Sequence, residues 1–176
     1  IMNEGEIINL IANAQEFQQL KVRDDELDEL DDLNHELCEV PVKGGSENVH
    51  GKVNILMQTY LSRGFVKSFS LVSDMSYINQ NAVRIARGLF QIILRQNNAI
   101  LAGRLLNMSK MFERQMWGSG TPLRQFTHIP MDIIEKIENR GLSVFALREM
   151  NSREISDMVK KKKYGEMIKR NANEFP

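Results

Sequence analysis

Helical periodicity runs through almost the whole sequence and limits the folds it can adopt. Apolar residues recur at intervals of three and four, and no segment alternates apolar and polar residues as a half-buried strand does. In the acidic segment after Arg23, leucines share one face of a predicted helix that Asp24 and Asp25 are expected to cap. The sequence therefore predicts an all-α fold.

A run of small residues divides the predicted helices into two groups. Gly118-Ser119-Gly120-Thr121-Pro122 combines a flexible linker with a proline that suits the first turn of a new helix. We expect a helical bundle over residues 1–120 and a small helix-loop-helix module over residues 121–176. The clearest predicted helices are Glu47–Ser62, Leu71–Gln96, Ala99–Met116, Pro130–Asn139, Val144–Glu149, Ser152–Val159 and Tyr164–Ala172.

The formal net charge of zero conceals a strong asymmetry. Residues 1–46 hold 12 acidic and three basic side chains, whereas residues 47–176 hold 11 acidic and 20 basic ones. A basic body is typical of proteins that bind phosphate groups, although it also occurs in proteins that bind none. The single cysteine, Cys38, excludes an intramolecular disulfide and fits a reducing compartment. No apolar run is long enough to predict a membrane span, and the initial isoleucine predicts that the sequence is a fragment.

No catalytic motif is present. The sequence lacks the Gly-x-x-x-x-Gly-Lys-Ser/Thr loop that cradles nucleotide phosphates, and it lacks a nucleophile elbow. His35 and Cys38 have zinc-like spacing, but no second pair completes four ligands, so we predict no metal site. The acidic run 24–32 could attract a cation. Its leucines, however, have the spacing of a core-facing helix stripe, which favours the interpretation that the acidic residues form the solvated face of that helix. We therefore expect neither catalytic residues nor a cofactor in this chain.

The predicted helix Leu71–Gln96 carries the most informative pattern. Its apolar residues cover more than half of its circumference, which predicts that it is the most buried helix of the bundle. Polar side chains nevertheless recur at steps of four, three and four along one face: Gln80, Arg84, Arg87 and Gln91. Acidic residues on neighbouring helices are one explanation, as internal salt-bridge partners. A channel for nucleic acid is the other, because guanidinium and amide groups bind phosphates and bases without requiring one sequence.

A second basic feature precedes the last predicted helix. Four consecutive lysines, Lys160, Lys161, Lys162 and Lys163, lead through Tyr164 into Gly165. Lysines beside backbone amides at a helix N-terminus can bind phosphate. A solubilising loop is the alternative.

Several motifs resemble the Sec sixty-three homology unit of large superfamily-two helicases. The resemblance rests on Ser46-Glu47-Asn48, on Gly51 through Gly64, on Phe69-Ser70-Leu71, on Gln80 through Arg84 and on Pro122-Leu123-Arg124-Gln125-Phe126 after Trp117. It covers nearly the whole chain. Gly44-Gly45, the Gln-Thr-Tyr run and the Ser-Arg-Gly run look most similar to the first of two such units in the helicase subunit of the activating signal cointegrator complex. A spliceosomal RNA helicase is the next most similar member.

The resemblance implies a non-catalytic accessory role. In the family, a long "ratchet" helix crosses the channel for the tracking strand, which would place Gln80, Arg84, Arg87 and Gln91 against single-stranded DNA or RNA. The helix-loop-helix module touches the exiting strand or the motor, which would give Lys160–Lys163 and Gly165 a role. ATP and Mg would belong to motor domains of a parent helicase in the nucleus and cytoplasm, and other subunits of a helicase complex would be partners. A protein-interaction scaffold is the alternative function.

Overall fold

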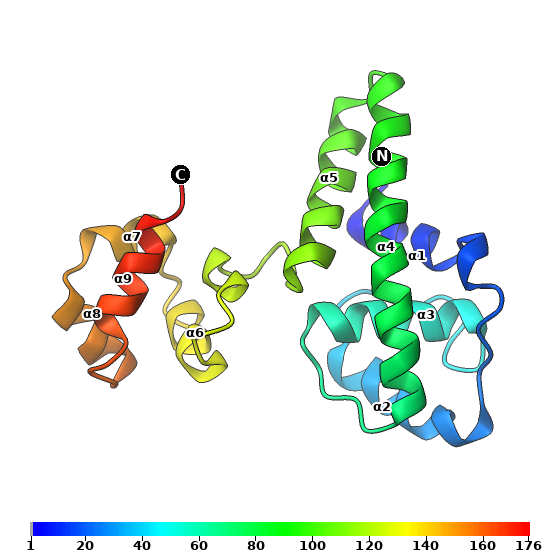
Figure 1. The fold of residues 1–176 in the computed structure, drawn as a ribbon, viewed down its shortest axis with the longest axis horizontal. Coiled ribbons are helices and arrows are strands. Elements are labelled where there is room, and N and C mark those ends of the chain that lie inside the picture. The colour runs from blue at the N-terminus through cyan, green and yellow to red at the C-terminus, as the bar shows by residue number, and fades with distance from the viewer. Residues whose placement is uncertain (1) are drawn as a thin grey trace. The chain divides into compact units, whose positions relative to one another are not determined.

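The computed structural model describes residues 2–176 and divides into two compact units. One ends at Gly118 and the other runs from Ser119 to Pro176, and each encloses its own hydrophobic core. The predicted division lies two residues later, between Gly120 and Thr121. The predicted all-α fold is confirmed, because the described residues form helices and no strand (Figure 1). The α-helices are α1 Glu4–Ala12, α2 Leu27–Leu37, α3 Val49–Leu61, α4 Phe69–Arg95, α5 Ala99–Arg114, α6 Met131–Glu138, α7 Val144–Glu149, α8 Ser152–Val159 and α9 Gly165–Asn173.

Short polar side chains begin several of these helices. Asn3 accepts a hydrogen bond from the backbone of Glu6, and Glu6 accepts one from the backbone of Asn3, so α1 begins with a reciprocal capping box. The predicted caps of α2 are wrong. Asp24 and Asp25 lie inside a short 3₁₀ helix, Asp24–Glu26, and α2 follows it without a side-chain cap because the preceding turn already supplies a helical entry.

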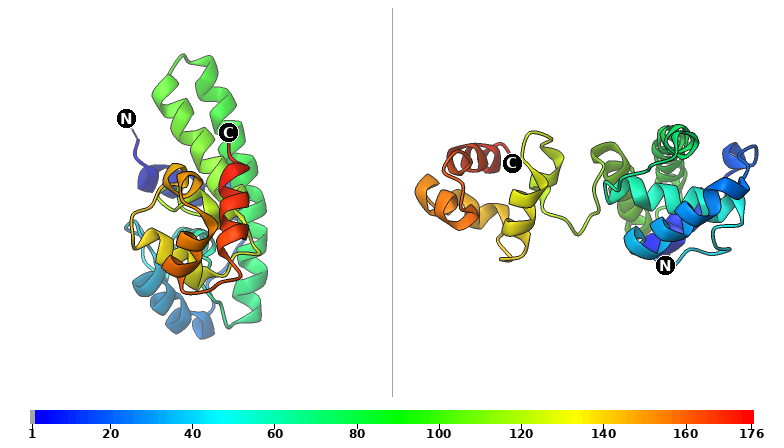
Figure 2. Two further views of the ribbon diagram at one scale, coloured as in Figure 1. Left: turned by 90° about the vertical axis from the view of Figure 1, so that its left-hand side faces the viewer. Right: turned by 90° about the horizontal axis from the view of Figure 1, so that it is seen from below.

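Helix α4 is the longest in the chain, as predicted, and forms an antiparallel hairpin with α5. The two helices lie side by side in Figure 1 and in the left view of Figure 2, and their connected end extends past the level of α1, α2 and α3. The side chains of Ile92 and Leu94, near that end, are each 55% exposed.

The prediction that α4 is the most buried helix is wrong. Ten of the 13 residues of α3 are buried, whereas only five of the 27 residues of α4 are. Helix α4 is the long central helix that was expected, but apolar residues near its end, such as Ile92 and Leu94, are exposed where the hairpin with α5 extends past the other helices (Figure 1). The buried polar residues of α3 are hydrogen-bonded: Gln58 donates to Asn54 Oδ1 at 2.8 Å, and Asn54 donates to Asn9 Oδ1 at 2.8 Å.

The second unit packs α6, α7, α8 and α9 around Ile133, Leu147 and Ile168, all fully buried. Gly165, the first residue of α9, lies directly against α8. A β-carbon at this position would lie 2.0 Å from Ser152 O and 2.1 Å from Ser156 Oγ. This close approach of two helices leaves no room for a β-carbon and therefore requires a glycine.

Candidate nucleic-acid interface

Gln80, Arg84, Arg87 and Gln91 all lie exposed along one face of α4. The opposite face turns Ile78, Ala82 and Ala86 into the core. Successive members of the polar set are three or four residues apart, so a helix of 3.6 residues per turn keeps them in one row. The row is a solvent-facing surface that a ligand can reach.

The two arginines have acidic neighbours, and these ion pairs lie on the surface. Arg84 Nη2 is 3.9 Å from Glu16 Oε1 and donates to Asn81 Oδ1 at 2.8 Å, with 71% of the arginine side chain exposed. Arg87, 61% exposed, donates to Glu113 of α5. Exposed ion pairs contribute only about 0–1 kcal/mol each. The guanidinium groups are therefore not committed to holding the bundle together.

Two further cations belong to the same region, and the initial pattern did not include them. Arg95 follows Gln91 by four residues and extends the row to the end of α4. Lys110 precedes Glu113 by three residues and shares its face of α5. Both side chains are exposed. Lys110 could be assigned to this region only once the structure showed that α5 packs beside α4, whereas the four-residue spacing from Gln91 already indicates Arg95.

The four lysines before α9 are all exposed, but each has different contacts. Lys160 ends α8 in a left-handed conformation, with φ of 57°. Lys161 Nζ donates to Asp132 Oδ2 of α6 at 2.9 Å, and this bond lowers the pKa of Asp132 and raises the pKa of Lys161. Lys162 uses its carbonyl to accept from Ser156 Oγ at 3.2 Å.

Lys163 lines a shallow hollow beside α9, together with Lys169 and Arg170. Lys169 Nζ is hydrogen-bonded to the carbonyl oxygens of Arg148 and Met150, so it also holds the end of α7. Arg170 lies on the same face as Lys163 and was not singled out from the sequence. Gly165 is buried. Its close packing against α8 accounts for a glycine at this position, so no bound ligand is needed to explain it.

Lys52 of α3 is fully buried, away from the α4 row, and has a structural role. Lys52 Nζ donates to Glu26 Oε2 at 2.6 Å and to Lys21 O at 2.8 Å, and it lies 2.8 Å from Asp74 Oδ2. Burial alone would raise the pKa of Glu26, but hydrogen bonds from Lys52 and Ser70 outweigh it and bring the pKa from 4.5 to about 2. This cluster ties α3 to the start of α4 and to the segment before α2.

The residues that raised the question of a metal are dispersed. His35 is exposed, and burial raises the pKa of the nearby Cys38 thiol to about 12. Across residues 2–176, no three His, Cys, Asp or Glu side chains gather closely enough to hold a metal ion. None of the helices in that range has the length and apolar character needed to cross a bilayer.

Comparison with known families matches residues 1–175 to the model of the Sec63 Brl domain. The chain belongs to the Sec63 Brl domain family. Sec63 Brl membership agrees with the helical architecture and confirms the resemblance inferred from the motifs around Gly51 and Pro122.

The curated relatives are much longer proteins. Over 173 residues the chain is 44% identical to activating signal cointegrator 1 complex subunit 3 of Gallus gallus, covering 98% of the chain. It is 42% identical over 176 residues to the DExH-box ATP-dependent RNA helicase DExH14 of Arabidopsis thaliana, and 34% identical over 175 residues to the U5 small nuclear ribonucleoprotein 200 kDa helicase of Homo sapiens. The chain spans about 8% of the length of each.

Proposed function

We propose that this Sec63 Brl chain is a non-catalytic accessory unit of an ATP-dependent helicase and guides the tracking single strand. The relatives DExH14 and the U5 200 kDa protein are named as helicases, and one of them as an ATP-dependent RNA helicase. The chain itself contains no nucleotide-binding motif. ATP and Mg would therefore bind motor domains elsewhere in the parent helicase.

The observation that carries the proposal is the exposed polar row of α4. Arg84 and Arg87 project from a rigid helix, with amides of Gln80 and Gln91 on either side. Guanidinium groups pair with phosphates and stack on bases, and amides bond to base edges. A strand crossing this face would exchange the carboxylates of Glu16 and Glu113 for its own phosphates. Since phosphate and carboxylate make similar bidentate contacts with arginine, the exchange costs little.

The lysines before α9 support a second contact with the strand. Lys160, Lys162 and Lys163 have side chains that form no described hydrogen bond or ion pair within residues 2–176, and Arg170 lies in the same hollow as Lys163. These groups would attract phosphates without recognising sequence.

A protein-interaction scaffold is the second candidate function. The end of the α4–α5 hairpin exposes Ile92, Leu94 and Ile100, each more than half accessible. Exposed apolar groups gathered at the end of a hairpin favour contact with another protein surface over contact with a strand. Docking on motor domains or on partner subunits of a helicase complex would cover them.

The test replaces Arg84 and Arg87 with alanine in the parent helicase. Binding to labelled single-stranded RNA and DNA is measured by fluorescence anisotropy at several salt concentrations, and unwinding is measured in parallel. We expect weaker binding, slower unwinding and nearly unchanged ATP binding. Each lost phosphate contact should lower the log–log salt slope by about 0.7.

A double variant, Lys43→Ala with Lys67→Ala, is the matched control. It removes the same charge from exposed positions of the same unit, away from the α4 row. If the arginine variant and this control lose affinity equally, only net charge matters and α4 does not guide the strand. If both retain full affinity and unwinding, the scaffold function is favoured.

A further inference from the structure

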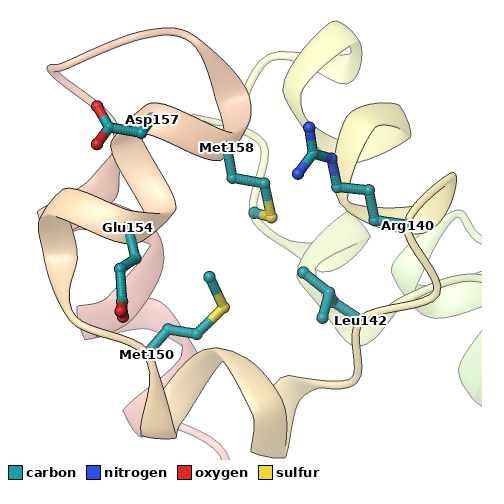
Figure 3. A pocket seen from close by; sticks show the side chains of 6 residues that line it. All are labelled: Arg140, Leu142, Met150, Glu154, Asp157 and Met158. Atoms are coloured by element: carbon teal, nitrogen blue, oxygen red, sulfur yellow. The ribbon is translucent and has the colours of Figure 1, made fainter.

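The second unit contains an open hollow, lined by three apolar and three charged side chains, that the strand-guiding role does not use. It has a volume of about 670 Å³ and lies between the α6–α7 connection and α8. Leu142, Met150 and Met158 form its floor, and in Figure 3 their side chains converge from three segments of the chain. A hollow of this size accommodates a large side chain with its neighbouring backbone.

Methionine makes this floor adaptable. Its thioether is polarizable and its unbranched chain has three rotatable bonds, so it fits apolar partners of different shape. Met158 is 8% exposed and Met150 is partly buried, so both are anchored in the core while their ends reach the hollow. The floor therefore favours an aliphatic or thioether side chain over a polar ligand.

Two acidic side chains and one basic side chain lie at the edges of the hollow. Glu154 and Asp157 lie three residues apart on α8 at one edge of the hollow, with the carboxylate of Asp157 directed outward, and Arg140 lies at the opposite edge (Figure 3). The formal balance is one negative charge. Within residues 2–176, neither Arg140 nor Asp157 forms a described ion pair, and Glu154 uses Oε2 to accept the backbone N–H of Asn151. An anionic strand would meet two carboxylates here, whereas a basic group would be attracted.

We propose that this hollow binds a protein segment that presents an aliphatic or methionine side chain next to a lysine or arginine. The apolar side chain would enter between Met150, Met158 and Leu142. The basic neighbour would pair with Asp157 and Glu154, and a backbone carbonyl of the segment would accept from Arg140. The site is independent of the α4 row, so its failure would leave the proposed strand-guiding function untouched.

The test observes the methionine methyl groups of the 176-residue chain by NMR after 13C-methyl labelling. The chain has ten methionines, of which only Met150 and Met158 line the hollow, so the others report non-specific effects. Met150→Leu and Met158→Leu assign the two signals. The probes are the capped peptides Gly-Lys-Leu-Lys-Gly, Gly-Glu-Leu-Glu-Gly and Gly-Lys-Ser-Lys-Gly, and a ten-nucleotide oligouridylate.

We expect saturable shifts of both methyl signals with the Lys-Leu-Lys peptide, and binding at least about tenfold weaker with the other three probes. Asp157→Lys, at an exposed position, should transfer the preference to the Glu-Leu-Glu peptide, and the remaining methionine signals verify that the variant is folded. Absence of a saturable shift at about 1 mM peptide, the weak end of measurable affinity, would overturn the proposal. Equal binding of the Lys-Leu-Lys and Glu-Leu-Glu peptides, or tighter binding of oligouridylate at these methyl groups, would also overturn it.

Discussion

Replacing Lys52 with methionine should destabilise the first unit severely, although it removes only one charge. Lys52 and Glu26 are both fully buried, and Lys52 directs its three N–H groups at Glu26, Asp74 and the carbonyl of Lys21. Methionine approximates the length of the lysine stem but donates no hydrogen bond. The substitution therefore leaves the Glu26 carboxylate buried without its main partner.

The magnitude follows from this burial. Breaking a buried ion pair by removing one partner costs about 3–5 kcal/mol. At the surface, Arg84→Ala removes the same charge from a side chain that is 71% exposed, and we expect a loss of at most about 1 kcal/mol. A double variant, Glu26→Gln with Lys52→Met, should be more stable than Lys52→Met alone, since it no longer buries a carboxylate whose remaining charged partner, Arg23, is half exposed.

The pKa of Glu26 gives the same cluster a defined pH dependence. Its folded pKa, about 2, lies below the ordinary 4.5, so the stabilisation is present above pH 4.5 and is lost as the pH falls towards 2. In Lys52→Met the first of the hydrogen bonds that lower this pKa is absent, so burial offsets more of the effect of the remaining bonds from Ser70 and Arg23 and the pKa is lowered less. The difference in the free energy of unfolding between the original protein and Lys52→Met should therefore become smaller as the pH falls from 4.5 towards 2.

The sole tryptophan provides the assay. Trp117 is buried in the first unit and donates its indole N–H to Ser62 Oγ at 2.8 Å. Urea unfolding monitored by its fluorescence reports this unit alone, and the measurement is repeated between pH 7 and pH 2. A Lys52→Met protein within about 1 kcal/mol of the original at pH 7, below the range expected for a broken buried pair, would refute the reasoning. A gap that stays constant on acidification would refute the assigned role of Glu26.

Two other substitutions test separate features. Glu113→Gln removes the carboxylate that competes for Arg87, and it should raise the affinity of the parent helicase for single strands by up to about fivefold; unchanged affinity in a titration would mean that Arg87 does not meet the strand. Gly165→Ala should destabilise the second unit by about 1–3 kcal/mol, because the new β-carbon would overlap Ser152 O. Far-UV circular dichroism should detect this loss while Trp117 fluorescence is unchanged, and Gly103→Ala, where the β-carbon meets no other atom, should be neutral or stabilising.

The sequence predicted the helices well because their signals are local. The bounds Val144–Glu149 and Ser152–Val159 are those of the structure, and the long helix differs by two residues at its start and one at its end. Apolar spacing and small capping residues act within a few positions of one another. The proline at 122 begins a short 3₁₀ helix at the place where a new helix was expected.

Depth within the bundle could not be predicted in the same way. Helix α3 contains Lys52, Asn54 and Gln58, which suggest an exposed helix, yet all three are buried because distant segments supply their hydrogen-bond partners. Conversely, Ile92 and Leu94 suggest a core helix but lie at the exposed end of a hairpin. Burial depends on which helices meet, and that information is not contained in the periodicity of one segment.

Only part of the candidate site could be predicted, because contacts between separate helices are not visible in the spacing of one helix. The spacing of Gln80, Arg84, Arg87 and Gln91 defined their common face, and that face is exposed. Spacing could not reveal that Glu113 of α5 lies against Arg87, nor that Arg170 lies near Lys163, since these pairs join separate helices. The role of these residues in binding nucleic acid remains a prediction.

The separation of the chain into two cores has a consequence for its behaviour on heating. The unit from Ser119 to Pro176 contains 58 residues, a size at which a chain buries only about 60% of its unfolded surface and is marginally stable. The larger unit encloses more apolar area and shares no core residue with it. On heating, or after a destabilising substitution in its own core, the unit that contains the methionine-lined hollow should therefore unfold first. The arginine row of α4 would survive on a folded remnant, so loss of one surface need not imply loss of the other.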